Sequence, residues 1–139
     1  MELLDSDLVY DAMYHYLNTI YFAIYSDDLG GFMGDMSRYI WTDGSSGDPV
    51  YYAVDYKDII EQVNNKYQIK NNSYTIEQAF EIMYLFLEKQ STLMGSKELP
   101  NFLNLMRVKI DNPQIHPHVW NDWLKAINKA IDNLNTKPL

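Results

Sequence analysis

The sequence predicts an all-helical protein folded as a compact bundle of about six helices. Apolar residues recur at helical spacing in several segments, and residue types that cap helices precede those segments. No segment of useful length alternates apolar and polar residues with the period of two that a half-buried strand shows. With 139 residues, 47% of them hydrophobic and 22% charged, the chain fits a single helical domain over residues 1–139.

In the first half, a long helix is expected from about Asp7 to Tyr25. Its apolar positions are Leu8, Ala12, Met13, Tyr16, Leu17, Ile20 and Ile24. A short helix follows, with Ser26 as its N-cap and acids in its first turn. A third helix begins at Asp48 with a proline in its first turn. Its expected inward residues are Tyr52, Tyr56, Ile59, Ile60 and Val63.

The second half shows the same order of elements. Residues 75–78, Thr-Ile-Glu-Gln, resemble a capping box that opens a long helix. Its inner stripe comprises Ile76, Ala79, Phe80, Met83 and Leu87. Ser96 is the expected N-cap of a short helix, and a last helix begins near His116-Pro117. That helix has an apolar stripe made of Trp120, Trp123, Leu124, Ile127, Ile131 and Leu134.

The two halves align with each other at a constant shift of 70 residues. Over residues 11–36 and 81–106 the alignment needs no gap, and Met13-Tyr14 falls on Met83-Tyr84. After a small change in length, Asp48-Pro49 corresponds to His116-Pro117. We therefore expect two pseudo-repeats of a three-helix unit, over residues 5–68 and 73–135.

The composition suits the cytosol. There is no cysteine, which excludes disulfides and thiolate metal sites. The N-terminus lacks the basic start and apolar stretch of a signal peptide. The longest apolar run, residues 20–25, is far shorter than the ~20 residues that span a bilayer. We expect a cytoplasmic protein that does not enter a membrane.

The net charge of −8 is unevenly distributed. Residues 1–70 hold 12 acids and 4 bases, whereas residues 71–139 hold 7 of each, so the whole imbalance lies in the first half. An acidic surface repels phosphate backbones, which argues against nucleic-acid binding. It would attract a basic partner. The alternative is a solvated acidic face that only keeps the protein soluble.

Catalytic and metal sites are not indicated. His118 and Asp122 share a helix face, but two ligands do not make a metal site. His15 lies on a polar flank of the first helix, where a surface contact explains it. Adjacent Asp27 and Asp28 suit the first turn of a helix better than acid–base chemistry. We expect no enzyme activity, no metal and no cofactor.

Tyrosine is unusually frequent, and 10 of the 12 tyrosines lie in residues 1–70. On the first helix, four of them are spaced to form one strip beside the aliphatic stripe: Tyr10, Tyr14, Tyr21 and Tyr25. Tyrosine combines a rigid apolar ring with a hydroxyl that tolerates water, so this strip suits a protein interface. Alternatively, the rings pack between the two repeats.

The run Ser26-Asp-Asp-Leu-Gly-Gly-Phe-Met-Gly-Asp-Met36, followed by Asp43-Gly44 and Asp48-Pro49, resembles small immunity proteins of bacterial contact-dependent growth inhibition and related polymorphic-toxin systems. The second half adds His116-Pro-His-Val-Trp-Asn-Asp-Trp123, which is similar to an ending often seen in that family. The resemblance implies a protein that binds and neutralises a cognate secreted toxin domain, in many systems a basic nuclease.

The expected partner-binding surface combines this resemblance with the charge asymmetry. It comprises the four tyrosines of the strip and six aspartates: Asp27, Asp28, Asp35, Asp43, Asp48 and Asp55. The alternative from another class is a self-associating helical adaptor or scaffold whose tyrosine strip forms a homodimer. The chain would accordingly be a monomer or a weak homodimer.

Overall fold

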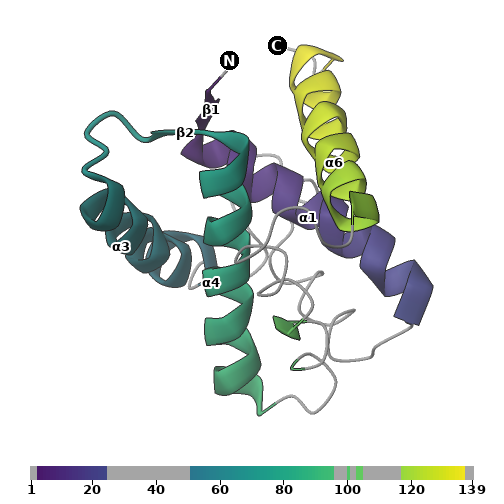
Figure 1. Ribbon diagram of the computed structural model, residues 1–139, viewed down its shortest axis with the longest axis horizontal. Helices are drawn as coiled ribbons and strands as arrows, with labels where there is room; N and C mark the ends of the chain where they lie inside the picture. Colours follow the sequence, from purple (N-terminus) through teal and green to yellow (C-terminus); the bar gives the residue numbers. More distant parts are fainter. Residues whose placement is uncertain (1–2, 25–50, 96–99, 101–102, 105–116, 137–139) are drawn as a thin grey trace.

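The computed structural model describes residues 3–24, 51–95, 100, 103–104 and 117–136, and this part of the chain is mostly helical (Figure 1). Helix α1 spans Ser6–Ile24, α3 spans Lys57–Tyr67, α4 spans Ile76–Met94 and α6 spans Pro117–Thr136. A π-helix, η1, covers Tyr51–Tyr56 and runs directly into α3. The predicted helical class is thus confirmed for the described residues.

The bundle of about six helices and its division into two pseudo-repeats stay predictions. The expected helix start at Asp48 and the short helix after Ser26 lie outside the described residues, as does most of the short helix after Ser96. Equivalent positions of α1 and α4, such as Met13 and Met83, are both buried. Any two amphipathic helices that face a common core would show this, so it does not establish a duplication.

Two very short strands are a small non-helical component of the described residues. Strand β1, Leu4–Asp5, pairs antiparallel with β2, Ser73–Tyr74, so that Leu4 lies opposite Tyr74. Two residues are too few to produce an alternating pattern, which is why the sequence did not indicate them. The pairing joins the start of α1 to the start of α4.

The helix ends follow local capping rules. The Asp5 carboxylate accepts a 2.8 Å hydrogen bond from the amide of Leu8 at the start of α1. The predicted capping box of α4 is present, since the amide of Gln78 donates to the Thr75 hydroxyl and the amide of Thr75 donates to the Gln78 side chain. Helix α4 ends at Gly95, whose φ of 63° lies in the left-handed region that favours glycine.

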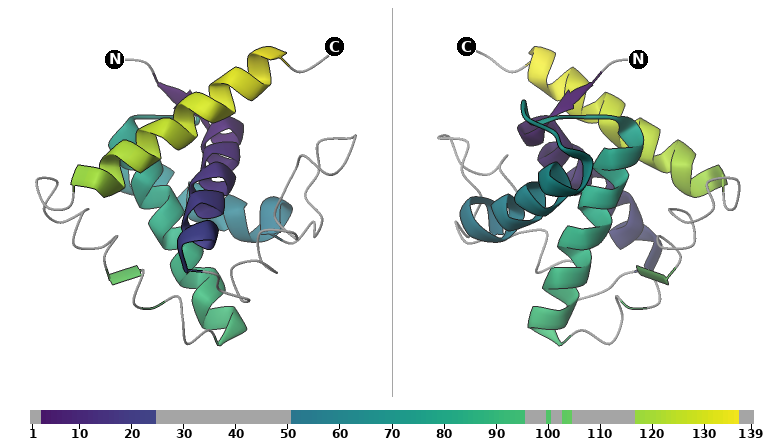
Figure 2. Two further views of the ribbon diagram at one scale, coloured as in Figure 1. Left: turned by 90° about the vertical axis from the view of Figure 1, so that its right-hand side faces the viewer. Right: turned by 60° about the vertical axis from the view of Figure 1, so that its left-hand side comes forward.

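The helices are arranged around the pair α1–α4. Helix α3 and helix α6 lie on opposite sides of this pair (Figures 1 and 2). Of the described elements, α1 and α6 share the most extensive contact, and α6 crosses α1 in both views of Figure 2. Strand β1 and the end of α6 lie at the same end of the molecule.

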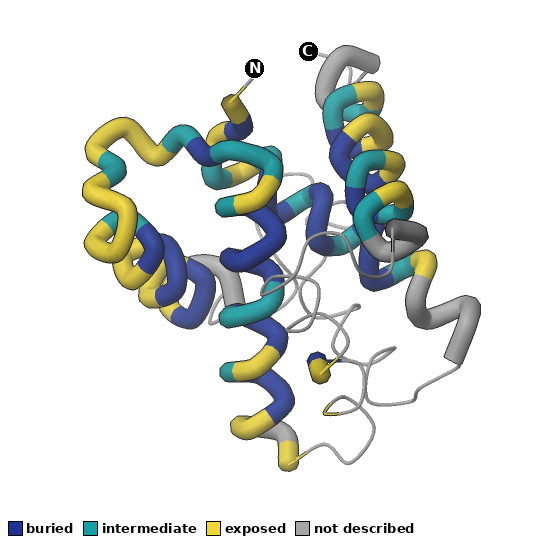
Figure 3. The backbone as a smooth tube through the Cα atoms, viewed as in Figure 1, coloured by how far each residue is buried: buried dark blue, intermediate teal, exposed yellow. Residues whose placement is uncertain are grey.

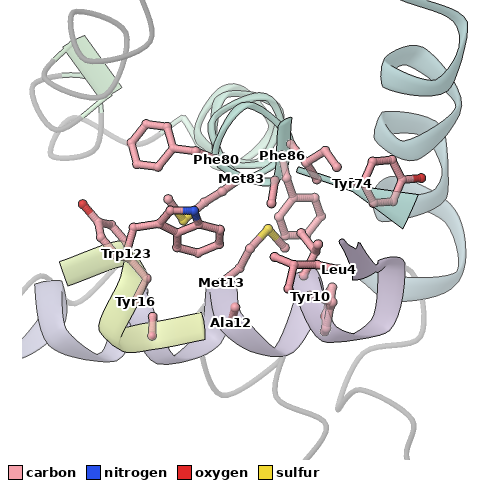
Figure 4. Packing of buried hydrophobic residues seen from close by; sticks show 14 of the residues in the cluster. Leu4, Tyr10, Ala12, Met13, Tyr16, Tyr74, Phe80, Met83, Phe86 and Trp123 are labelled. Atoms are coloured by element: carbon pink, nitrogen blue, oxygen red, sulfur yellow. The ribbon is translucent and has the colours of Figure 1, made fainter. Parts of the chain in front are cut away.

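The core is aromatic. Buried faces of α1, α3 and α4 turn toward one another (Figure 3), and the side chains of α1 and α4 meet between these helices (Figure 4). Trp123 of α6 is fully buried beside Tyr16 and Phe80, at ring-centroid distances of 5.9 and 6.0 Å. Its indole donates a 3.2 Å hydrogen bond to the carbonyl of Ile76. Trp123 therefore anchors α6 to both α1 and α4.

The predicted core residues of the described helices are mostly confirmed. Tyr56, Ile59, Ile60 and Val63 are buried, as expected from their spacing. In α6, Trp123 and Ile127 are buried, whereas Trp120 and Ile131 are only partly buried against the core. No helix of the described residues is long and apolar enough to cross a bilayer.

Candidate protein-binding surface

Most of the predicted partner-binding residues lie outside the described residues. These are Asp27, Asp28, Asp35, Asp43, Asp48 and Tyr25. Tyr21 belongs to α1, but its side chain is also outside the description. Only Tyr10, Tyr14 and Asp55 can be placed.

Tyr10 belongs to the core and not to a surface strip. Its side chain is fully buried, and its ring packs edge-on against Tyr56 at 4.9 Å and against Phe86 at 6.1 Å. Edge-to-face packing of aromatic rings is favourable because the positive ring edge meets the negative face. For Tyr10 the prediction of an exposed position was wrong, because Tyr56 of η1 and Phe86 of α4 pack over this side of α1.

Tyr14 lies at the boundary between core and solvent. It is half-buried, packs against the core cluster and makes an edge contact with His15, with ring centroids 5.6 Å apart. A partly exposed aromatic ring fixed by its neighbours can join an interface at low entropic cost. Of the described tyrosines predicted for the surface, Tyr14 alone keeps exposed area.

Asp55 is buried between η1 and α4, and not exposed as the predicted partner-binding surface requires. The Gln90 amide donates a 2.7 Å hydrogen bond to its Oδ2, and the Lys89 ammonium lies 3.6 Å from its Oδ1. A buried carboxylate needs such partners, because it has lost its hydration. Asp55 thus ties η1 to α4.

Among the described residues of the acidic half, the exposed carboxylates are not the ones predicted for the partner-binding surface. Asp5 and Asp7 are exposed at the start of α1, and Asp58 and Glu61 are exposed on α3. The Tyr56 hydroxyl donates a hydrogen bond to the Ser6 carbonyl, which brings the start of α3 to the start of α1. The three-residue spacing of Asp58 and Glu61, opposite the apolar residues of α3, was the signal that could have identified them.

Lysines close to some of the carboxylates partly neutralise their negative charge. Lys89 lies 3.1 Å from Asp58 and also faces Asp55, so one cation serves two acids. On α3 itself, Lys66 is engaged by Glu81 of α4 at 2.7 Å. Chemically, such exposed acids can accept charge-assisted hydrogen bonds from arginine or lysine of a basic surface.

His15 also departs from its expected place on a polar flank. It is buried where α1 meets α6, and its Nε2 lies 3.1 Å from the Asn133 side-chain amide. Burial first, and then the nearby positive charge of Lys129, lowers the pKa of His15 from 6.5 to about 4. The neighbours Asp11 and Asn18 look polar in the sequence, but α6 covers this face of the helix.

Comparison of the chain with protein-family models, with curated proteins and with solved structures finds no match. Among the described residues, no three His, Asp or Glu side chains are grouped so that they could hold a metal ion. The charge distribution and the contacts of this chain are therefore the basis for the proposals that follow.

Proposed function

We propose that this chain is an immunity protein that binds a cognate secreted toxin domain and neutralises it. It acts by forming a protein complex and not by catalysis. The charge distribution supports this proposal most directly, because the entire net charge of −8 lies in residues 1–70. Exposed acids of α1 and α3 belong to that half. Such a surface attracts and orients a cationic protein.

The resemblance of Ser26–Met36 and of the Asp48-Pro49 pair to immunity proteins gives the proposal its biological class. A basic nuclease domain is the toxin that best fits the acidic half. The rival reading, a homodimer through the tyrosine strip, is weakened because Tyr10 is in the core. A concentration-independent monomer in sedimentation would argue further against it.

The function is tested with the toxin domain encoded beside this gene. Cells that express the C-terminal domain of a neighbouring secreted protein should stop growing, and co-expression of this chain should restore growth. The purified pair should form a 1:1 complex with a dissociation constant on the order of nanomolar or tighter. The proposal fails if the neighbouring genes encode no toxic domain, or if this chain neither binds nor protects.

The acidic surface is tested separately by two matched charge reversals. One variant changes Asp27, Asp28, Asp43 and Asp48 to Lys. The control changes Glu77, Glu88, Glu98 and Asp132 to Lys, which alters the net charge by the same amount in the other half. Only the first variant should slow association, by at least about tenfold at low salt, because steering depends on where the charge lies. Equal slowing in both would refute the site while leaving the function standing.

A further inference from the structure

His15 joins α1 to α6 through a polar contact at their buried seam. Its side chain is 8% exposed, and its Nε2 lies 3.1 Å from Nδ2 of Asn133. A side-chain amide nitrogen can only donate, so Nε2 must accept in this arrangement. The imidazole is then neutral and has its proton on Nδ1.

The contact lies far from the anchor of α6. Trp123 holds the first half of the helix through its bond to the Ile76 carbonyl and its packing on Tyr16. Asn133 comes ten residues later, about 15 Å further along the helix axis. Between them, the small buried residues Ala126 and Ala130 let α6 approach α1 closely. Trp123 and Asn133 thus hold α6 at two points, one in each half of the helix, and Figure 2 shows α6 crossing α1 obliquely.

We propose that neutral His15 latches the C-terminal half of α6 onto α1, and that protonation of this ring releases that half of the helix. Protonated Nε2 would direct an N–H group at the donor amide of Asn133. Rotation of that amide could restore a hydrogen bond, but it would not remove the positive charge from the buried seam.

The charges around the ring oppose protonation on balance. Helix α6 places Lys129 near His15, and the exposed Asp132 precedes Asn133 on the same helix. On α1 itself, the half-buried Asp11 lies one turn earlier and would favour a charged ring. Burial first, and Lys129 second, still lower the pKa to about 4, so the surroundings as a whole disfavour the charged ring.

Helix α4, which also packs on α1, does not supply a compensating acid among its described residues. Glu81 is paired with Lys66 of α3, Glu88 bonds the Tyr84 hydroxyl, and Glu77 is exposed in the first turn. The latch is therefore closed above pH 6.5 and opens progressively as the pH falls from 6.5 toward 4.

The proposal is tested by hydrogen–deuterium exchange across this pH range, corrected for the intrinsic exchange rate. Protection of residues 126–136 should fall by at least about tenfold between neutral pH and pH 4.5, whereas α4 keeps its protection. NMR should show His15 of the intact protein titrating near 4. Simultaneous loss of protection in α4 and α6 would overturn the proposal, and so would a His15 pKa of 6.5 or above.

Variants separate this ring from the other titrating groups. His15→Gln keeps an acceptor for Asn133 and cannot be protonated, so residues 126–136 should stay protected at low pH. The control variant, H116Q/H118Q, should keep the wild-type pH profile. Lys129→Gln removes the neighbouring cation from an exposed position, so the closed seam tolerates a protonated His15 better and the loss of protection at low pH should be smaller than in wild type, which tests the latch even if His15→Gln does not fold. A wild-type profile in His15→Gln, or an undiminished loss of protection at low pH in Lys129→Gln, would refute it.

Discussion

The hydroxyl of Tyr56 donates a 2.6 Å hydrogen bond to the main-chain carbonyl of Ser6, which lies 50 residues earlier in the chain. The bond joins the π-helix η1 to the first turn of α1, next to the paired rings of Tyr10 and Tyr56. It fixes how α3 and its exposed acids are oriented relative to α1. An interaction over this separation is not visible in any local sequence pattern.

Replacing Tyr56 with Phe should lower the free energy of unfolding by about 1 kcal/mol, because the ring contacts remain and only the part-buried hydrogen bond to Ser6 is lost. Urea denaturation followed by far-ultraviolet circular dichroism measures this change. The matched control is Tyr84→Phe, which removes an exposed bond to Glu88 on the surface of one helix. That loss should be no more than about 0.5 kcal/mol. Equal effects in both variants would contradict the role given to the Tyr56 bond.

Replacing Asp55 with Ala should destabilise the fold by about 2 kcal/mol, since a buried charge-assisted bond to Gln90 is lost. Asp58→Ala is the control, because it removes an exposed partner of the same Lys89 and should cost less than about 1 kcal/mol. Asp55→Asn should recover part of the loss, because its amide oxygen can still accept from Gln90. If Asp55→Ala keeps full stability but slows toxin association, Asp55 contacts the partner after all.

Replacing Trp123 with Ala should cost about 3–5 kcal/mol, because the indole fills the space between α1, α4 and α6. Trp123→Phe should cost less, since a ring remains, but the bond to the Ile76 carbonyl is lost. The control Trp120→Phe acts at a partly buried ring and should have a smaller effect than Trp123→Phe. Thermal unfolding reports the order of the three variants, and a reversed order of the two Phe variants would contradict Trp123 as the anchor of α6.

The buried phenol of Tyr16 should make the fold sensitive to alkali. Burial first, and the negative charge of Asp122 second, raises the pKa of Tyr16 above its ordinary value of 10.0. The folded state therefore disfavours ionisation, so the stability contribution is complete below pH 10 and declines as the pH rises above it. Tyr16→Phe should unfold less steeply with alkali than wild type, measured by circular dichroism. Tyr67→Phe, at a position 42% exposed, should follow the wild-type curve.

Local patterns predicted a large part of the described fold. The apolar spacing of Leu8, Met13 and Leu17 predicted α1, and the Thr75–Gln78 capping box predicted the start of α4. The predicted start of the last helix, near His116-Pro117, agrees with α6. These features depend on residues within one or two turns of each other, so a single sequence contains the information.

The predictions of surface residues were less successful than those of the helices, because exposure depends on long-range packing. Tyr10, His15 and Asp55 are polar or amphipathic residues that the pattern placed outside, and all three are buried. Each is covered by an element distant in the chain: Tyr10 by η1 and α4, His15 by α6, and Asp55 by α4. Whether such a residue is exposed depends on whether a later element of the chain packs over it.

The amino-acid sequence by itself determined the helical class, the excess of acids in residues 1–70, both ends of α1 and the starts of α4 and α6. The tertiary structure decided which polar groups became interior, as in the pairing of Asp55 with Gln90 and of His15 with Asn133. Helical periodicity is a property of neighbours along the chain, whereas satisfying a buried polar group requires a partner from another helix, and only the assembled bundle brings that partner within hydrogen-bond distance.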